Sequence, residues 1–212
     1  MKLEEFITIT NGLPVIESEF LCAGLPDPAS FKVQLSRWQK SGKIIQLKRG
    51  VYLLAEAYRK IQLYEPYVAG VLKRPSYISL EKGLEYYSLI PEAVMVYTSV
   101  TTKRPGRFAT KVGTFDFRHV KESLFWGYES VCLNNQTAFF AAPEKALLDY
   151  FYLKGRNISI DYLKEMRLQN VEKIDMNKLL NYAQKFESPS MLKAAKIVGE
   201  YVSLYQKDEK IL

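Results

Sequence analysis

The stretch from residue 31 to 54 limits the possible folds of this chain more than any other. Phe31, Leu35 and Trp38 recur at i, i+4 and i+7, so a helix would place them on one side. Gly42 favours the end of that helix, and the following residues alternate as a strand, a tight turn and a second strand. The apolar stripe of the helix therefore needs other helices to pack on, and the helix leads directly into a hairpin.

Two shorter helices are expected before this stretch. An apolar-rich segment that ends at Gly12 predicts the first, and a second follows Pro14 and ends near Gly24. Ser30 is placed to cap the third helix. Three helices closed by a hairpin are typical of a winged helix-turn-helix, which we assign to residues 1–57.

The remaining residues, 58–212, predict a larger mixed α+β domain with a helical C-terminal tail, so the fold class is α+β. Val, Phe, Tyr and Thr are enriched in the expected strands, and Pro143 suits the first turn of a helix. In chain order we expect a helical link over 55–72, a helix over 79–89, strands over 93–101, 111–118, 126–131 and 137–141, a helix over 143–154, and three helices from 159, the last over about 190–206.

The distribution of charge is more informative than its total. A net charge of +7 favours a polyanionic partner only weakly. Between Pro28 and Ala55, however, the chain carries six Lys and Arg residues and no Asp or Glu. The expected third helix and hairpin therefore present an acid-free basic surface.

That surface suits double-stranded DNA, because a helix fits the ~12 Å width of the major groove. Short polar side chains near the helix start, together with Arg37, can reach base edges, while Lys40 and Lys43 would lie near phosphates. Lys48 and Arg49 at the hairpin tip would contact the minor groove or its backbone. The candidate DNA-binding residues are Ser30, Lys32, Gln34, Arg37, Lys40, Lys43, Lys48 and Arg49.

A second basic cluster surrounds a Pro-Gly sequence that we expect to form a hairpin between two strands. Its cations could add phosphate contacts, although Lys and Arg at such a turn also keep the edge of a sheet soluble. The possible secondary phosphate contacts are Lys103, Arg104, Arg107 and Lys111.

The sequence offers little for catalysis or metal binding. His119 is the only histidine, and there is no glycine-rich phosphate loop or His-Glu-x-x-His motif. Glu144 and Asp149 follow Pro143 on an expected helix, where capping and packing explain them better than a carboxylate pair does. We therefore expect no enzyme activity, no cofactor and no metal.

We expect a cytoplasmic protein without a membrane partner. The longest apolar stretches are five residues long, whereas a helix needs about 20 to span a bilayer. Glu4 and Glu5 stand where a secretory signal would carry a basic stretch.

Several motifs in order resemble the AbiEi family, the antitoxins and transcriptional regulators of bacterial abortive-infection (type IV) toxin–antitoxin systems. The resemblance extends from about residue 31 to 150. The matching motifs are Leu35-Ser-Arg-Trp-x-x-Ser-Gly-x-Ile, Leu47-x-Arg-Gly-Val-Tyr, Tyr77-Ile-Ser-Leu with Leu84, Phe115-x-Phe with His119-Val, and Ala142-Pro-Glu-Lys-Ala-Leu-Leu-Asp.

The resemblance implies a winged helix that binds inverted repeats in its own promoter and represses the operon. It also implies a second domain that neutralises a nucleotidyltransferase-like toxin encoded alongside, with or without a stable complex. The family's DNA-contacting positions would correspond to Lys32, Arg37, Lys40, Lys48 and Arg49.

Two other classes of function compete with an autorepressor and antitoxin. One is an enzyme that acts on nucleic acid, with the winged helix delivering the substrate. The other is a protein-interaction module that uses its basic face without DNA. A nucleotidyltransferase-like reading frame directly downstream would favour the antitoxin.

The charge pattern generates a first prediction, that the protein binds the DNA upstream of its own reading frame with an affinity that falls steeply with salt. Each phosphate contact should add about 0.9 to the slope of log affinity against log salt concentration, because it releases condensed counterions. Fluorescence anisotropy between low and physiological salt measures this slope. A slope near zero would exclude the electrostatic interface.

Overall fold

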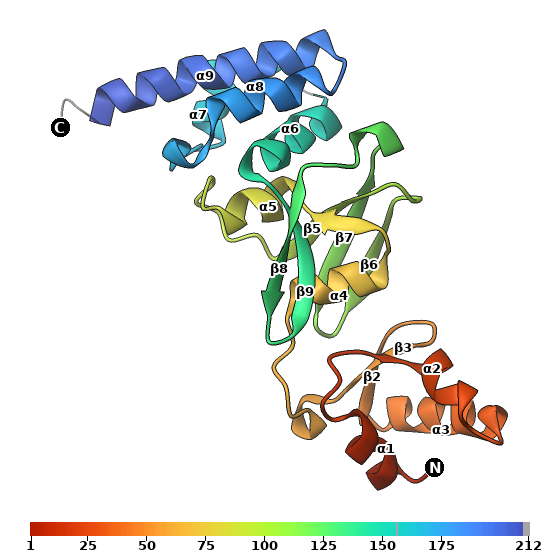
Figure 1. The fold of residues 1–212 in the computed structure, drawn as a ribbon. Helices are drawn as coiled ribbons and strands as arrows, with labels where there is room; N and C mark the ends of the chain where they lie inside the picture. Colours follow the sequence, from red (N-terminus) through yellow and green to blue (C-terminus); the bar gives the residue numbers. More distant parts are fainter. Residues whose placement is uncertain (156, 210–212) are drawn as a thin grey trace.

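The computed structural model describes residues 1–155 and 157–209, and these form a mixed α+β structure. In Figure 1 the N-terminal helices lie at one end, a large sheet occupies the middle, and the C-terminal helices lie at the other end. The first part contains α1 (Leu3–Thr10), α2 (Ser18–Ala23) and α3 (Pro28–Lys40), with a small three-stranded sheet.

The third helix begins earlier than the sequence predicted. Asp27, not Ser30, is its N-cap: the Asp27 carboxylate accepts a hydrogen bond from the Ser30 amide at 3.1 Å, and Pro28 occupies the first turn. The expected apolar stripe is confirmed, since Phe31, Leu35 and Trp38 are all buried. Their rings and methyl groups pack with Phe6 of α1 and Ile16 in one cluster.

The small sheet has the order β1-β3-β2 and is antiparallel, with β1 (Ile16–Glu17), β2 (Ile44–Lys48) and β3 (Val51–Leu54). The expected hairpin is confirmed by the pairing of β2 with β3. The region after Pro14 was expected to be wholly helical and begins instead with β1, because Ile16 pairs with Tyr52 and is buried.

The large sheet has six strands in the order β6-β7-β5-β4-β9-β8. The pairs β5–β7 and β4–β9 are parallel, and the other neighbours are antiparallel. The strands are β4 (Ser76–Ile78), β5 (Val96–Thr101), β6 (Gly106–Thr110), β7 (Gly113–His119), β8 (Tyr128–Leu133) and β9 (Gln136–Ala141).

Two of these strands, β4 and β6, were not predicted. β4 spans three residues, which is too short to show alternation. The Pro105-Gly106 sequence was expected to form a hairpin between the strands at 93–101 and 111–118, and this was wrong: these strands, β5 and β7, are parallel neighbours, and β6 lies between them in the chain. The tight turn lies instead at Lys111-Val112, between the antiparallel strands β6 and β7.

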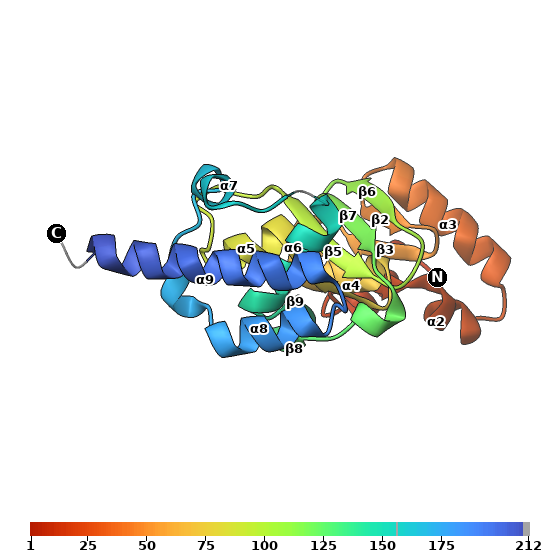
Figure 2. The same ribbon diagram turned by 90° about the horizontal axis from the view of Figure 1, so that it is seen from above.

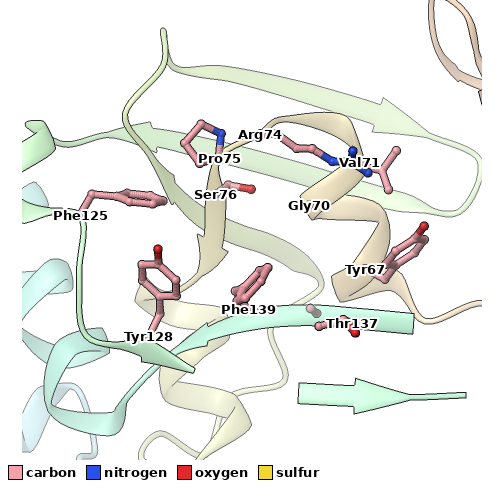
Figure 3. A pocket seen from close by; sticks show the side chains of 11 residues that line it. Tyr67, Gly70, Val71, Arg74, Pro75, Ser76, Phe125, Tyr128, Thr137 and Phe139 are labelled. Atoms are coloured by element: carbon pink, nitrogen blue, oxygen red, sulfur yellow. The ribbon is translucent and has the colours of Figure 1, made fainter. Parts of the chain in front are cut away.

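Helices cover the sheet on both faces. The first face carries α4 (Glu65–Leu72), which replaces the longer helical link expected over 55–72; the segment before α4 holds only a short 3₁₀ turn at Glu56–Tyr58. Neighbouring residues show the two faces: Ile78 packs with the α4 residues, whereas Tyr77 packs in the cluster on the opposite face. A cavity lies between α4 and the β8–β9 hairpin (Figure 3).

The opposite face carries α5 (Leu80–Tyr86) and α6 (Pro143–Lys154). Beyond them lie α7 (Ile160–Glu165), α8 (Met176–Gln184) and α9 (Pro189–Glu209), and Figure 2, a view from above, shows α9 extending across α6 with α8 beside it. The three expected C-terminal helices are thus confirmed, and they bury Leu163, Leu179 and Val198 in the largest apolar cluster.

The β2–β3 hairpin is apolar on both sides. Tyr52 and Leu54 face α1 and α3, whereas Leu47, Val51 and Leu53 face the large sheet and α4. Successive side chains of a strand point to opposite faces, so a single short hairpin can belong to two cores. The residues that complete the second core are Val68, Ala69, Val71, Leu72, Ile78, Phe115, Phe117, Ala138 and Phe140.

Polar contacts reinforce this junction. Gln136, fully buried at the start of β9, donates to the Gln62 carbonyl at 2.8 Å and accepts from the Tyr64 amide at 3.0 Å. The Lys60 amide donates to the Asn11 carbonyl at 3.0 Å. The segment that joins the two parts is therefore held by both of them.

Among the described helices, none combines the length and the apolar character needed to cross a membrane.

The shared hairpin predicts that Leu53→Ala destabilises both parts of the molecule together. Leu53 is 1% exposed, and truncating a buried leucine costs about 2 to 5 kcal/mol of unfolding free energy. Trp38 reports on the N-terminal core and Trp126 on the C-terminal core, so single-tryptophan variants can follow each by fluorescence during urea denaturation.

The matched control is Leu133→Ala, since Leu133 is 50% exposed at the end of β8 and its truncation should change stability by less than about 0.5 kcal/mol. A Leu53→Ala protein in which only the Trp38 transition shifts would show that the two cores unfold independently.

Candidate functional site

The outer face of α3 carries most of the predicted DNA-contacting side chains. Ser30, Lys32, Arg37 and Lys40 are exposed there, and Gln34 is half-buried. Lys32 and Lys40 are eight residues apart, which corresponds to about 12 Å along a helix. Because the opposite stripe is buried, the basic side chains gather on one accessible face.

The start of α3 also carries a carboxylate. The Ser30 side chain and amide both hydrogen-bond to Asp27, and these bonds hold the pKa of the Asp27 carboxyl below its usual value. A lowered folded-state pKa stabilises the fold above the unfolded pKa, and this contribution is lost as pH falls through the folded value. Ser30 therefore belongs to the capping contact with Asp27, while Lys32, Arg37 and Lys40 carry the charge.

The two cations at the hairpin tip have different surroundings. Lys48 Nζ donates to the carbonyls of Val71 at 2.8 Å and Leu72 at 3.0 Å, at the C-terminus of α4. Burial lowers the pKa of the Lys48 ammonium, with Glu17 opposing that shift. Arg49 is exposed. Lys48 thus has a structural role at the junction, and its DNA contact stays a prediction.

The backbone fixes this tip closely. Gly50 has a φ of +78°, which favours glycine, and its carbonyl accepts a hydrogen bond from the Ser18 amide at 2.8 Å. The half-buried Lys43 lies at the other end of the hairpin, where its amide donates to the Trp38 carbonyl.

The second basic cluster follows one edge of the large sheet. Lys103 and Arg104 lie in the loop before the edge strand β6, Arg107 lies within it, and Lys111 lies at its far end. All four side chains are exposed. They form a line rather than a compact patch, and Asp116 stands directly opposite Arg107 in the β6–β7 pairing.

A buried ion pair occupies the centre of the larger part. Lys145 and Asp149, one turn apart on α6, pair with each other, and both side chains are 0% exposed. Asp149 also accepts hydrogen bonds from the Tyr77 hydroxyl at 3.0 Å and the Ser79 hydroxyl at 2.9 Å. The Tyr77-Ile-Ser-Leu motif and the α6 motif therefore meet in one network.

Burial dominates the electrostatics of this network. It raises the pKa of Asp149 and lowers the pKa of Lys145, while each group opposes the shift of the other. Trp126 and Phe186 surround the Lys145 ammonium at 4.7 Å and 4.9 Å from their ring centroids. Both groups are withdrawn from solvent, so each charge is compensated by its partner and not by water.

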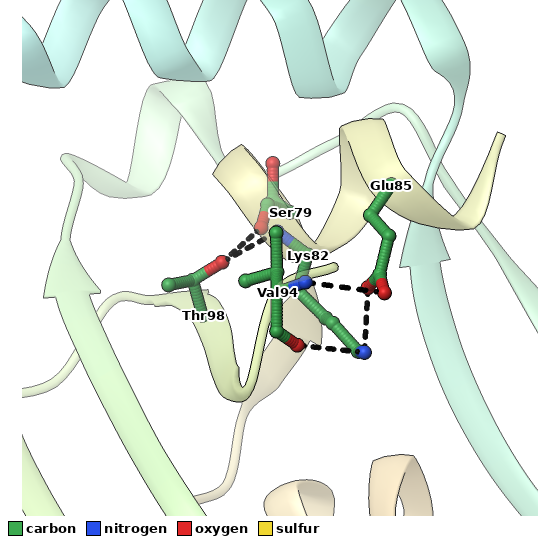
Figure 4. Close-up of polar contacts among 5 residues, drawn as sticks. All are labelled: Ser79, Lys82, Glu85, Val94 and Thr98. Atoms are coloured by element: carbon green, nitrogen blue, oxygen red, sulfur yellow. Dashed lines mark hydrogen bonds and ion pairs between the residues drawn. The ribbon is translucent and has the colours of Figure 1, made fainter. Parts of the chain in front are cut away.

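Hydrogen bonds hold Ser79 in place for this contact (Figure 4). Thr98 Oγ1 donates to the Ser79 carbonyl at 2.7 Å and accepts from the Lys82 amide at 2.9 Å. Lys82 Nζ, in turn, donates to the Val94 carbonyl at 3.0 Å and pairs with Glu85 at 2.5 Å. These bonds fix the start of α5, where Leu80 has an uncommon φ of 59°.

Glu144, which the sequence assigned to capping and packing, is also buried. It accepts a hydrogen bond from the Asp175 amide at 2.9 Å and pairs with Lys178 at 3.1 Å, so it connects α6 to α8. The sequence did not predict that Glu144, Lys145 and Asp149 would all be buried, because the other groups that surround them come from distant segments. Within the described residues, no three His, Cys, Asp or Glu side chains gather to hold a metal ion.

No protein-family model matches this chain, and no curated protein is significantly similar to it. The resemblance to the AbiEi family therefore rests on the ordered motifs of the sequence.

The buried pair predicts strong coupling between two substitutions. Asp149→Leu alone leaves the Lys145 ammonium buried without its partner and should cost about 3 to 5 kcal/mol of unfolding free energy. Lys145→Met combined with Asp149→Leu removes both charges and should be clearly more stable than Asp149→Leu alone. Urea denaturation of the wild type, Asp149→Leu and the double variant measures these unfolding free energies. A double variant that is less stable than Asp149→Leu contradicts the prediction.

Proposed function

We propose that the chain is a sequence-specific DNA-binding protein that uses the outer face of α3. The observation that carries the proposal is the acid-free exposed set of Lys32, Arg37 and Lys40 on a helix whose opposite stripe is buried. A convex, basic helix face of this kind fits the major groove, where Arg37 can pair with a guanine edge.

The N-terminal part supports a winged helix-turn-helix identity for this unit. Its α2 and α3 are joined by the short segment Gly24–Asp27, and the β2–β3 hairpin follows α3 directly. The hairpin tip contributes Arg49 to the DNA interface, while Lys48 holds the tip against α4. The exposed cations Lys103, Arg104, Arg107 and Lys111 are proposed only as secondary phosphate contacts.

The resemblance to the AbiEi family adds the proposal that the protein represses its own operon and neutralises a nucleotidyltransferase-like toxin. Support comes from the sequence motifs, whose Tyr77, Ser79 and Asp149 meet in one buried network. Co-expression with a nucleotidyltransferase-like protein encoded downstream tests it: growth should be rescued by the intact chain, and no rescue overturns the antitoxin role without affecting DNA binding.

The test of DNA binding compares Arg37→Ala, Arg49→Ala and the control Lys196→Ala, which removes an exposed cation from α9 at the far end of the molecule. Arg37→Ala should cost about 1 to 3 kcal/mol of binding free energy on the upstream DNA and relax discrimination at one base position. Arg49→Ala should weaken upstream and random DNA alike, because phosphate contacts carry no sequence information.

Fluorescence anisotropy with upstream and random duplexes of equal length gives both quantities. If Arg37→Ala and Lys196→Ala lose the same affinity, the outer face of α3 is not the DNA interface. If wild-type protein binds neither duplex, the proposed function itself is wrong and a protein-interaction module is favoured.

A further inference from the structure

A cavity of about 390 Å³ lies between α4 and the β8–β9 hairpin. Pockets that bind small molecules begin at about this size and are mostly apolar with a few polar groups. Figure 3 shows Phe125, Tyr128 and Phe139 on one side of the cavity and Tyr67 and Arg74 on the other.

The first wall of the cavity is aromatic and rigid. Tyr128 lies 5.2 Å from Phe125 and 5.8 Å from Phe139, measured between ring centroids. Behind it, Tyr77 stacks on Tyr128 at 4.8 Å, and Tyr77 is held by its hydrogen bond to the buried Asp149. Phe139 lines the cavity and is 43% exposed, so part of its ring is accessible from the cavity side or from solvent.

The opposite wall carries positive charge. Arg74 lines the cavity, and its guanidinium makes only a long ion pair with Glu17 at 3.7 Å, with 65% of the side chain exposed. The charges of Arg74 and Lys73 both act on the nearby Lys48 ammonium. Both ammonium groups donate to backbone carbonyls, and of the three cations Arg74 is the one that lines the cavity.

A glycine keeps the cavity open. Gly70 lies within α4 and lines the cavity, and a Cβ atom placed there would meet no atom within 4 Å. Glycine inside a helix is unfavourable relative to alanine. The position beside Gly70 is therefore open among the described residues, in the wall that Tyr67 and Arg74 also line.

We propose that this cavity binds a small planar aromatic anion, a ring that stacks against Tyr128 and Phe139 with a carboxylate or phosphate group paired to Arg74. Aromatic side chains favour stacked or edge-on planar rings, and a guanidinium favours carboxylates and phosphates through paired hydrogen bonds. An aromatic carboxylate and a nucleoside monophosphate share this chemistry.

Isothermal titration calorimetry of the full chain with two matched pairs of probes tests the proposal. Indole-3-acetate is compared with the neutral indole-3-acetamide, and AMP with adenosine. The anionic member of at least one pair should bind about tenfold or more tightly than its neutral partner, as expected for one charged pairing. The pair that shows this difference identifies the source, aromatic carboxylate or nucleotide.

Three substitutions locate the site. Gly70→Leu should abolish binding by filling the cavity, whereas Gly70→Ala, its fold control, should melt no lower than wild type. Arg74→Gln should remove the preference for the anion and leave binding of the neutral probe unchanged. Glu17→Gln should raise affinity for the anion by about two- to fivefold, because Glu17 is the carboxylate that competes for Arg74.

These measurements need no DNA, so their outcome is independent of the proposed function. The site is overturned if none of the four probes binds the wild-type protein, if anionic and neutral probes bind equally, or if a folded Gly70→Leu protein binds as wild type does.

Discussion

The structure depends on one short hairpin whose two faces are both buried. Val51 and Leu53 complete the core beneath α4 and the large sheet, while Tyr52 and Leu54 complete the core beneath α1 and α3. The alternation of a strand makes this possible, since adjacent side chains point in opposite directions. The hairpin lies before residue 57 in the sequence, yet it contributes Val51 and Leu53 to the core beneath α4. A cut at residue 57 would therefore expose apolar side chains on both fragments.

The same hairpin explains why neighbouring cations have different roles. The tip turns toward α4, so Lys48 reaches the last carbonyls of that helix, where a cation also interacts favourably with the helix dipole. Arg49, one residue further, remains in solvent. The basic face of α3 is thereby held in a fixed orientation relative to the large sheet, and Glu17 and Arg74 add a weak ion pair across the same junction.

The larger part is organised around charge that is fully removed from water. Lys145 and Asp149 compensate each other within α6, and Tyr77 and Ser79 use the remaining acceptor capacity of the carboxylate. Buried charges are tolerated when they are paired and hydrogen-bonded. Tyr77 also stacks on Tyr128, so the buried network is in direct contact with the aromatic wall of the cavity beside α4.

The sequence by itself determined the elements with strong local signals. Helix α3, the β2–β3 hairpin, α6 and the C-terminal helices follow from periodicity, glycine and proline positions, which act within a few residues. It also placed the exposed cations on α3, because a buried stripe fixes the opposite face. Only the tertiary structure decided the short strands β1 and β4, the edge position of β6, the engagement of Lys48 and the burial of Glu144, Lys145 and Asp149. Each of these depends on partners far away in the chain, such as Val71 for Lys48 and Tyr77 for Asp149, and no local pattern encodes which distant segments meet.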